Sequence, residues 1–309
     1  MRKKVLESVY ELAKKNNKVL FIGSDLGPQV LADYKKQFPN RFFMEGAAEQ
    51  HLISMAAGLA LEGFIPYVNT IATFLTRRCF EQITLNLGLQ KTKVRLIANG
   101  GGLVYSPLGP THLAIDDLAL MRSVPNMTIV VPADANEMSK FMEKTIDYPG
   151  PIYIRVAKGG DPIVSNIFKD DFKIGKIYSI NEDCENLIFT TGITLNIALK
   201  IKESLLESNI NIGIIHVPTI KPIDSKFISE ITKNTKNIFT IEEHSIVGGL
   251  GSAISEIILE SNPNKIEFFK RIGLDDIFPK GYGRQHNMME KYKIDFHSCL
   301  TMIKGVLNG

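Results

Sequence analysis

The sequence is poor in cysteine. Its 309 residues include three, Cys79, Cys184 and Cys299, which lie far apart and in no disulfide or metal-ligand spacing. This pattern is typical of a reducing compartment, and we expect each thiol to be a small core residue. Long apolar runs are also missing: none approaches the roughly 20 uncharged residues that span a bilayer, and segment 1–18 does not have the apolar stretch of a signal peptide. We therefore expect a cytoplasmic protein without a membrane segment.

An excess of charge of one sign is missing as well. The 36 basic and 33 acidic residues give a formal net charge of +3 and are spread along the chain without a basic block. Proteins that bind nucleic acid through its phosphates usually carry such a block, so nucleic acid is a poor candidate partner. The 44% hydrophobic and 22% charged residues are typical of a globular chain with a sizeable core.

Short apolar runs alternate with amphipathic segments along the whole chain. The segments "KVLFIGSDLG", "FIPYVNTI" and "VRLIANGG" predict buried strands, and "EQHLISMAAGLALEG" and "ATFLTRRCFEQITLNLGLQ" have apolar residues at helical spacing. This alternation predicts an α/β fold in which helices cover both faces of a parallel sheet. A stretch rich in proline, glycine and polar residues around 150–175 marks a boundary. We predict two three-layer α/β/α domains, residues 1–165 and 166–309.

Glu49 stands at the start of the second predicted helix, in "MEGAAEQH", where its small-residue flanks predict burial. An ionised carboxylate is costly to bury without a partner, so it is either paired or kept for a chemical purpose. For a lone glutamate, a first-turn position favoured by the helix dipole is the alternative. In "TFLTRRCF", Phe74, Arg77 and Phe80 are spaced three apart, which predicts one side of a helix. Core packing is the alternative for the aromatic rings, whereas Arg77 between them indicates a planar ligand or a nearby carboxylate.

Two glycine-rich segments are candidate loops. The segment "NGGGLVYSPLGPTH" lacks the GxGxxG and GxxxxGK[ST] spacings that cradle phosphates, but His112 at its end would lie where loops after parallel strands line a crevice. A lone histidine at such a position is often structural. The segment "EEHSIVGGLGSAI" predicts a glycine turn entering a helix, which favours either an anion at the helix N-terminus or tight strand-to-helix packing.

Several motifs together resemble a known family. The segments "GAAEQHLISMAAGLALEGFIPYVNTIATFL", "EQI", "GPTH", "VPNMTIVVPADANE", "GPIYIRVAKG" and "TIEEHSIVGGLGSAI" occur in an order that resembles the C-terminal half of transketolase and of deoxyxylulose-phosphate synthase. The resemblance covers nearly the whole chain. It implies a pyrimidine-binding domain followed by a transketolase C-terminal-type domain.

The resemblance also implies a cofactor and roles for particular residues. In that family thiamine diphosphate lies across a subunit interface, and a glutamate that matches Glu49 hydrogen-bonds N1′ of the aminopyrimidine ring and drives the tautomer change that activates the cofactor. Phe74 and, by position, Arg77 and Phe80 would surround that ring. Asp25 matches an acidic residue near the cofactor.

Substrate contacts are implied in the same way. His112 matches the histidine that contacts the substrate and moves protons on sugar hydroxyls. Arg155 and Lys158 stand where relatives place a cation for a substrate phosphate; an exposed strand end is the alternative for both. Leu108 replaces an aspartate that recognises a hydroxyl of the donor sugar, which puts ordinary pentose-phosphate substrates in doubt.

The family's diphosphate and Mg²⁺ site is missing from the sequence. It requires a GDG motif and a downstream asparagine in a separate domain, and no GDG occurs here. The resemblance therefore implies a split transketolase-like enzyme, in which an N-terminal-type partner chain supplies that site and both assemble as an alpha2beta2 heterotetramer. Such an enzyme would transfer a two-carbon ketol unit from a ketose to an aldehyde. The alternatives are the β subunit of a 2-oxo-acid or acetoin dehydrogenase complex and a non-catalytic assembly subunit.

Overall fold

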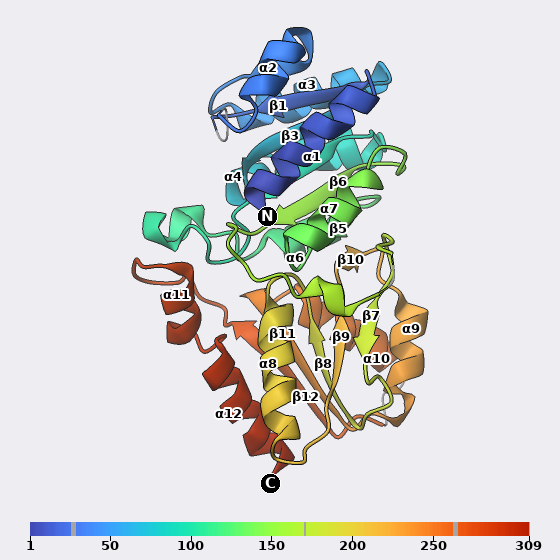
Figure 1. Ribbon diagram of the computed structural model, residues 1–309, viewed down its shortest axis with the longest axis vertical. Helices are drawn as coiled ribbons and strands as arrows, with labels where there is room; N and C mark the ends of the chain where they lie inside the picture. Colours follow the sequence, from blue (N-terminus) through green and yellow to red (C-terminus); the bar gives the residue numbers. More distant parts are fainter. Residues whose placement is uncertain (26–28, 170, 262–264, 309) are drawn as a thin grey trace.

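The protein forms two sheets stacked along its long axis, each covered by helices on both faces (Figure 1). The computed structural model describes residues 1–25, 29–169, 171–261 and 265–308. The first sheet contains, in spatial order, β10 (Thr219–Lys221), β5 (Thr128–Val130), β6 (Ile152–Val156), β4 (Arg95–Asn99), β3 (Ile65–Ile71), β1 (Val19–Gly23) and β2 (Phe42–Met44). The second contains β12 (Phe268–Leu274), β11 (Asn237–Ser245), β8 (Asn186–Thr190), β9 (Gly213–His216) and β7 (Tyr178–Ile180).

Helices pack on both faces of the first sheet. Apolar side chains on one face come from α1 (Arg2–Lys15), α2 (Ala32–Gln37) and α7 (Ala135–Glu143). The other face is covered by α3 (Glu49–Leu61), α4 (Ala72–Thr76), the π-helix Ile83–Leu89 that follows α5 (Phe80–Gln82), and α6 (Asp117–Ser123). Short 3₁₀ turns lie at Pro39–Arg41, Ser106–Leu108, Pro110–His112, Ser165–Ile167 and Thr232–Asn234.

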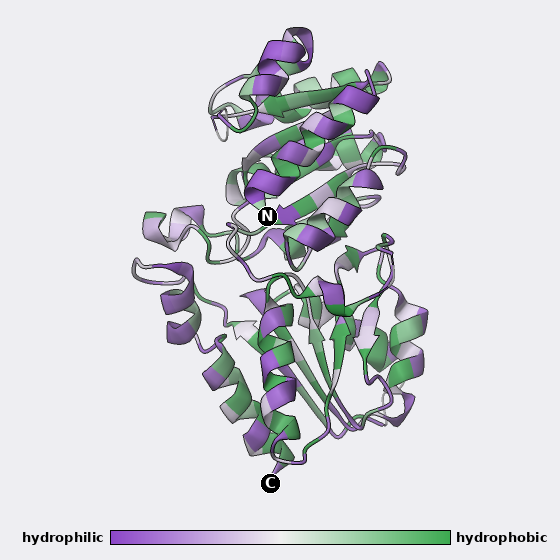
Figure 2. Ribbon diagram, viewed as in Figure 1, coloured by the Kyte–Doolittle hydropathy of each residue, from purple (hydrophilic) through white to green (hydrophobic). Residues whose placement is uncertain are grey.

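The second sheet is covered in the same manner. The helices α8 (Thr194–Leu206), α11 (Gln285–Lys291) and α12 (Phe296–Leu307) contribute to one apolar cluster, and α9 (Ser225–Ile231) and α10 (Leu250–Ser261) to another. Apolar residues gather on the strands and on the inner sides of the helices, as Figure 2 shows. Every residue of β1, β3, β4 and β6 is buried, which is expected of parallel strands covered on both faces. The predicted α/β fold class is confirmed.

Two features differ from the pattern in the sequence. Segment 72–90 is not one helix, because α4 ends at Thr76 and a turn separates it from α5 and the π-helix. Strand β10, which comes from the second half of the chain, pairs antiparallel with β5 at the edge of the first sheet. The two halves are therefore joined by strand pairing as well as by side-chain packing.

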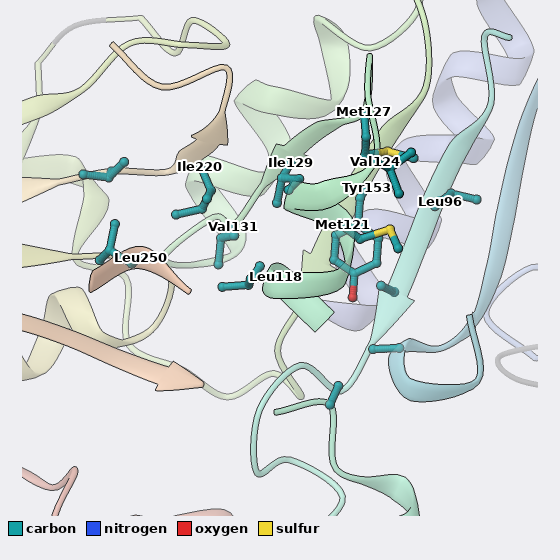
Figure 3. Packing of buried hydrophobic residues seen from close by; sticks show 14 of the residues in the cluster. Leu96, Leu118, Met121, Val124, Met127, Ile129, Val131, Tyr153, Ile220 and Leu250 are labelled. Carbon is teal, nitrogen blue, oxygen red and sulfur yellow. The ribbon is translucent and has the colours of Figure 1, made fainter. Parts of the chain in front are cut away.

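One apolar cluster runs from the first sheet into the second. Leu118, Val131 and Ile129 of the first half lie beside Ile220 of β10 and Leu250 of α10 (Figure 3). This shared core fixes the loops at the carboxyl edge of the first sheet against the C-terminal half. Within the described residues, no helix is both long and apolar enough to cross a membrane.

Candidate active site

The predicted site residues lie on loops that follow the carboxyl ends of strands in the first sheet. Strands β2, β1, β3, β4 and β6 are parallel neighbours, so their carboxyl ends lie at the same edge. Asp25 follows β1, Glu49 follows β2, Phe74 follows β3, His112 follows β4, and Lys158 follows β6. Ligands of open α/β sheets bind at this edge.

Glu49 is the first residue of α3, and its side chain is 3% exposed. Its Oε2 accepts a hydrogen bond from Nη1 of Arg78 at 2.5 Å, which compensates the buried charge. No donor within the described residues reaches Oε1. The carboxylate is thus held by one oxygen, and the other oxygen has no protein partner in the described part of the chain.

Arg78 contacts Phe74, whose ring in turn contacts His112. The guanidinium carbon of Arg78 lies 4.5 Å from the ring centre of Phe74, within the range of a cation–π contact. The Phe74 ring is half-buried and meets the His112 ring edge-to-face with centres 5.1 Å apart. His112 Nδ1 lies 3.0 Å from Thr111 Oγ1. Glu49, Arg78, Phe74 and His112 therefore form a continuous row, which we call the site row.

Arg77 meets a nearby carboxylate, one of the two alternatives that its position indicates. It does not lie between Phe74 and Phe80: its Nε donates to Asp116 at 2.8 Å and its Nη2 to the Leu113 carbonyl at 3.1 Å. A cavity of about 250 Å³ lies beside this ion pair, and its lining also includes Ile115, Ser245, Asp276, Ile277 and Phe278. Phe80 begins α5 and packs against the core instead.

Sequence reasoning missed Arg78, although its spacing from Phe74 held a signal. Residues i and i+4 of a helix face the same side as well as residues i and i+3. Arg77 is three residues after Phe74 and Arg78 is four residues after it, so either could share a side of a helix with Phe74. The turn after Thr76 directs Arg77 toward Asp116 and leaves Arg78 above the Phe74 ring.

Arg155 is not a free cation for a substrate phosphate, and it is not an exposed strand end; both expectations are wrong. Its side chain is 7% exposed, and it donates to both oxygens of Asp117, from Nε at 2.8 Å and from Nη2 at 3.0 Å. Nη2 also donates to the carbonyls of Ala114 and Glu243. The Tyr153 hydroxyl donates to Asp117 at 2.7 Å. Arg155 therefore joins the two halves of the protein.

The remaining predicted residues lie near the surface. Lys158 is exposed two residues beyond β6, and Asp25 is exposed with one oxygen accepting from Ser24 Oγ at 2.9 Å. Leu108 is 52% exposed in the 3₁₀ turn before Gly109. The structure therefore links Glu49 to Phe74 through Arg78 and places His112 against Phe74. The side chains of Lys158, Asp25 and Leu108 lie outside this row.

In the "EEHSIVGGLG" segment, a glutamate side chain lies at the N-terminus of the helix that follows. Glu242 accepts hydrogen bonds from the backbone amides of Leu250 at 2.7 Å and Gly251 at 2.9 Å, so a carboxylate of the same chain occupies the N-terminus of α10. A side chain at Gly249 would collide with the Glu242 carboxylate. Tight strand-to-helix packing, one of the two alternatives, is what the structure contains.

Two family models match the chain: transketolase, pyrimidine binding domain, over residues 1–160, and transketolase, C-terminal domain, over residues 175–297. The chain belongs to the transketolase family. It is 35% identical to a putative transketolase C-terminal section of Methanocaldococcus jannaschii, over 98% of this chain and 95% of that protein. It is 32% identical to a subunit of the apulose-4-phosphate transketolase of Phocaeicola vulgatus, over 99% and 97%.

Structural similarity agrees with this family. A solved structure described as a split gene transketolase, inactive beta4 tetramer, superposes with a TM-score of 0.88 at 33% identity, covering 99% of this chain and 98% of that one. The chain is also 33% identical to 1-deoxy-D-xylulose-5-phosphate synthase 1 of Geobacter sulfurreducens, but the match covers 42% of that longer protein. The predicted resemblance to the C-terminal half of the family is confirmed.

In this transketolase-family chain, Glu243 ties the loop that carries His112 to the C-terminal half. Its Oε1 accepts from the Leu103 amide and from Gln285 Nε2, both at 2.8 Å. Gly102, at φ +68°, lies so close that a side chain there would meet the Glu243 carboxylate. Farther along, Ser106 Oγ donates to the Gly283 carbonyl at 2.8 Å, and the loop lies beside the segment that precedes α11 (Figure 1).

Burial raises the pKa of Glu243 from its ordinary 4.5 to about 7, although Arg155 opposes the shift. The Glu243 carboxyl group therefore binds its proton more tightly in the folded protein than in the unfolded chain. As the pH rises from 4.5 to about 7, the contribution of Glu243 to the free energy of unfolding falls. We expect Glu243→Gln to remove that fall, which amounts to about 3 kcal/mol over the interval. Urea unfolding at several pH values measures it.

The matched control is Glu256→Gln, because Glu256 is exposed in its ion pair with Arg122. Its unfolding free energy should follow the wild type at each pH. A Glu243→Gln protein whose stability kept the same pH dependence as the wild type would contradict the assignment.

Proposed function

We propose that this chain is the pyrimidine-binding and C-terminal subunit of a thiamine-diphosphate-dependent transferase of the transketolase type. The enzyme would move a two-carbon ketol unit from a ketose donor to an aldehyde acceptor. The observation that carries the proposal is the site row at the carboxyl edge of the first sheet. In it a buried carboxylate, one oxygen of which has no partner among the described residues, lies near an aromatic ring and a histidine. Similarity over nearly the full length of proteins described as a transketolase C-terminal section and a transketolase subunit supports a split enzyme.

The residues of the site row fit an aminopyrimidine ring. Such a ring needs a flat apolar surface on which to stack and a carboxylate oxygen near its ring nitrogen. Phe74 offers a half-buried face, and Oε1 of Glu49 has no donor within the described residues. The guanidinium of Arg78 contacts both side chains and holds Oε2 of Glu49, which leaves Oε1 for the ring nitrogen.

Each residue of the site row would have a role that follows from its position. Bound thiamine diphosphate supplies the electron sink that lets a carbon–carbon bond next to a carbonyl break. Oε1 of Glu49 would share a proton with the ring nitrogen, and Phe74 would fix the plane of the ring. His112, with Nδ1 next to Thr111, would exchange a proton with a substrate hydroxyl through Nε2. We further propose that Asp25, Arg77 and Phe80 border the cofactor and that Lys158 meets the substrate; none of these four belongs to the site row.

The partner would complete the other end of the site. We propose that an N-terminal-type transketolase chain holds the diphosphate and supplies most of the Mg²⁺ coordination, and that two copies of each chain assemble. Among the described residues, no three His, Cys, Asp or Glu side chains converge as a metal site. The partner is to be sought as a chain of similar length that carries GDG and the downstream asparagine.

A reconstitution experiment tests the proposal. The two chains are co-expressed and supplied with thiamine diphosphate, Mg²⁺ and candidate ketoses: free, phosphorylated, sulfonated and nucleotide-linked. Relatives named for apulose-4-phosphate and 6-deoxy-6-sulfo-D-fructose motivate the phosphorylated and sulfonated sets. We expect ketol transfer to an aldehyde by the pair and none by either chain alone. Decarboxylation of pyruvate, or acetoin cleavage, without ketose cleavage would instead identify a 2-oxo-acid dehydrogenase-type subunit.

Leu108 gives a specificity prediction. The exposed leucine cannot accept a hydrogen bond from a donor-sugar hydroxyl, and an aspartate at this position can. We expect Leu108→Asp to raise kcat/KM by about 5- to 150-fold for a donor with a hydroxyl there, relative to the analogue without it, because the pair is worth roughly 1–3 kcal/mol. Competition between the two donors measures the ratio. Leu108→Asn, which also offers an acceptor, should shift it in the same direction, and an unchanged ratio in both variants would refute the role.

A further inference from the structure

Arg78 contacts two members of the site row at once. Its Nη1 donates to Oε2 of Glu49 at 2.5 Å, and its guanidinium carbon lies 4.5 Å from the ring centre of Phe74. The two partners come from different elements, Glu49 from the start of α3 and Phe74 from α4. Arg78 lies in the turn after α4 and is therefore the link between these elements at the site.

The hydrogen bond to Oε2 determines which carboxylate oxygen is available. A charge-assisted hydrogen bond at one oxygen limits the rotation of the carboxylate and so restricts the direction of the other oxygen. Oε1 is the oxygen without a described donor, so it is the one left for a ligand. The cation–π contact with Phe74 in turn limits where the guanidinium can lie, and this restricts the position of the carboxylate relative to the aromatic ring.

We propose that Arg78 is a positioning residue for Glu49: it holds Oε2 and thereby directs Oε1 toward the nitrogen of the aminopyrimidine ring. This inference rests on the proposed function. Arg77 cannot take over the task, because its Nε and Nη2 already donate to Asp116 and Leu113. The Arg78 side chain is 45% exposed, so its truncation removes little buried surface, and we expect the variants to fold.

The test separates orientation of one oxygen from general packing. The assembled enzyme, with its partner chain, is titrated calorimetrically with thiamine diphosphate and with the N1′-deaza analogue, in which a carbon replaces the ring nitrogen. We expect Arg78→Ala to weaken binding of thiamine diphosphate by about 10- to 100-fold, the range of a lost charge-assisted hydrogen bond. Binding of the deaza analogue should not change, since it makes no hydrogen bond to Oε1. Arg78→Lys keeps the charge without the planar fork, and we expect it to recover part of the affinity.

A second arginine serves as the matched control. Arg41 also lies over a phenylalanine ring, 3.9 Å from the centre of Phe38, and it precedes β2 at the opposite edge of the sheet. Arg41→Ala should leave the affinity for both compounds unchanged.

The remaining outcomes are decisive. Equal weakening of thiamine diphosphate and the deaza analogue would make Arg78 a packing residue and overturn the inference. Unchanged or tighter binding of thiamine diphosphate by Arg78→Ala would also overturn the inference. Tighter binding would mean that the guanidinium competes with the cofactor for the site. These results leave the proposed function standing. If the wild-type assembly binds neither compound, the proposed function and the inference fail together.

Discussion

Glu49→Gln is expected to lower turnover of the assembled enzyme by about 100- to 10,000-fold, the range that a positioned acid–base group contributes. Glutamine has nearly the same shape, so its side-chain oxygen can still accept from Arg78, which lies over Phe74. The amide has no ionisable proton to share with a ring nitrogen, and it loses the charge that pairs with Arg78. Single-turnover kinetics of the reconstituted pair, with cofactor binding measured in parallel, separates loss of chemistry from loss of binding.

The control for this change is Glu81→Gln. Glu81 is an exposed glutamate of α5 in the same domain and lies outside the site row. Its turnover should match that of the wild type. If Glu49→Gln also turned over at the wild-type rate, Glu49 would be a first-turn glutamate that serves the helix alone, the alternative that the sequence leaves open.

The fold could be predicted from the sequence because its signals are local. β3 and β4 are mostly apolar and buried at every residue, as is expected of strands covered on both faces, and Glu49 begins α3, a helix rich in small residues. The loops that carry the site follow from this order, since parallel strands place their carboxyl ends at one edge. Strand β10 escaped prediction because its pairing with β5 joins residues about ninety positions apart.

Side-chain partners are harder to predict than positions. The resemblance implies that Arg155 stands where relatives place a cation for a substrate phosphate, but its partner Asp117 is 38 positions away in the chain. Nothing in the local pattern indicates that pairing. The choice between Arg77 and Arg78 depends on where α4 ends, and Cys79, at φ −109° and ψ 16°, interrupts the helix that regular spacing predicts. Helical spacing is informative while the helix continues, and it is misleading once a turn intervenes.

Arg155→Met is expected to reduce the free energy of unfolding by about 3–5 kcal/mol, the cost of leaving a buried charge without its partner. Asp117 is fully buried and would keep one hydrogen bond, from the Tyr153 hydroxyl. The carbonyls of Ala114 and Glu243 would lose a donor in the same step, which loosens the contact between the two halves. Denaturant unfolding monitored by far-ultraviolet circular dichroism measures the change.

Two further variants test whether the loss of stability comes from the unpaired carboxylate of Asp117. Lys144→Met breaks the ion pair with Asp171, in which both partners are exposed, and should cost less than about 1 kcal/mol. The double variant Arg155→Met with Asp117→Leu removes both charges, so it should be more stable than Arg155→Met alone, because the penalty comes from the unpaired carboxylate rather than from the lost attraction. Were the double variant less stable than the single one, the Tyr153 contact and local packing would account for the loss, and Asp117 would not be the residue that makes Arg155 necessary.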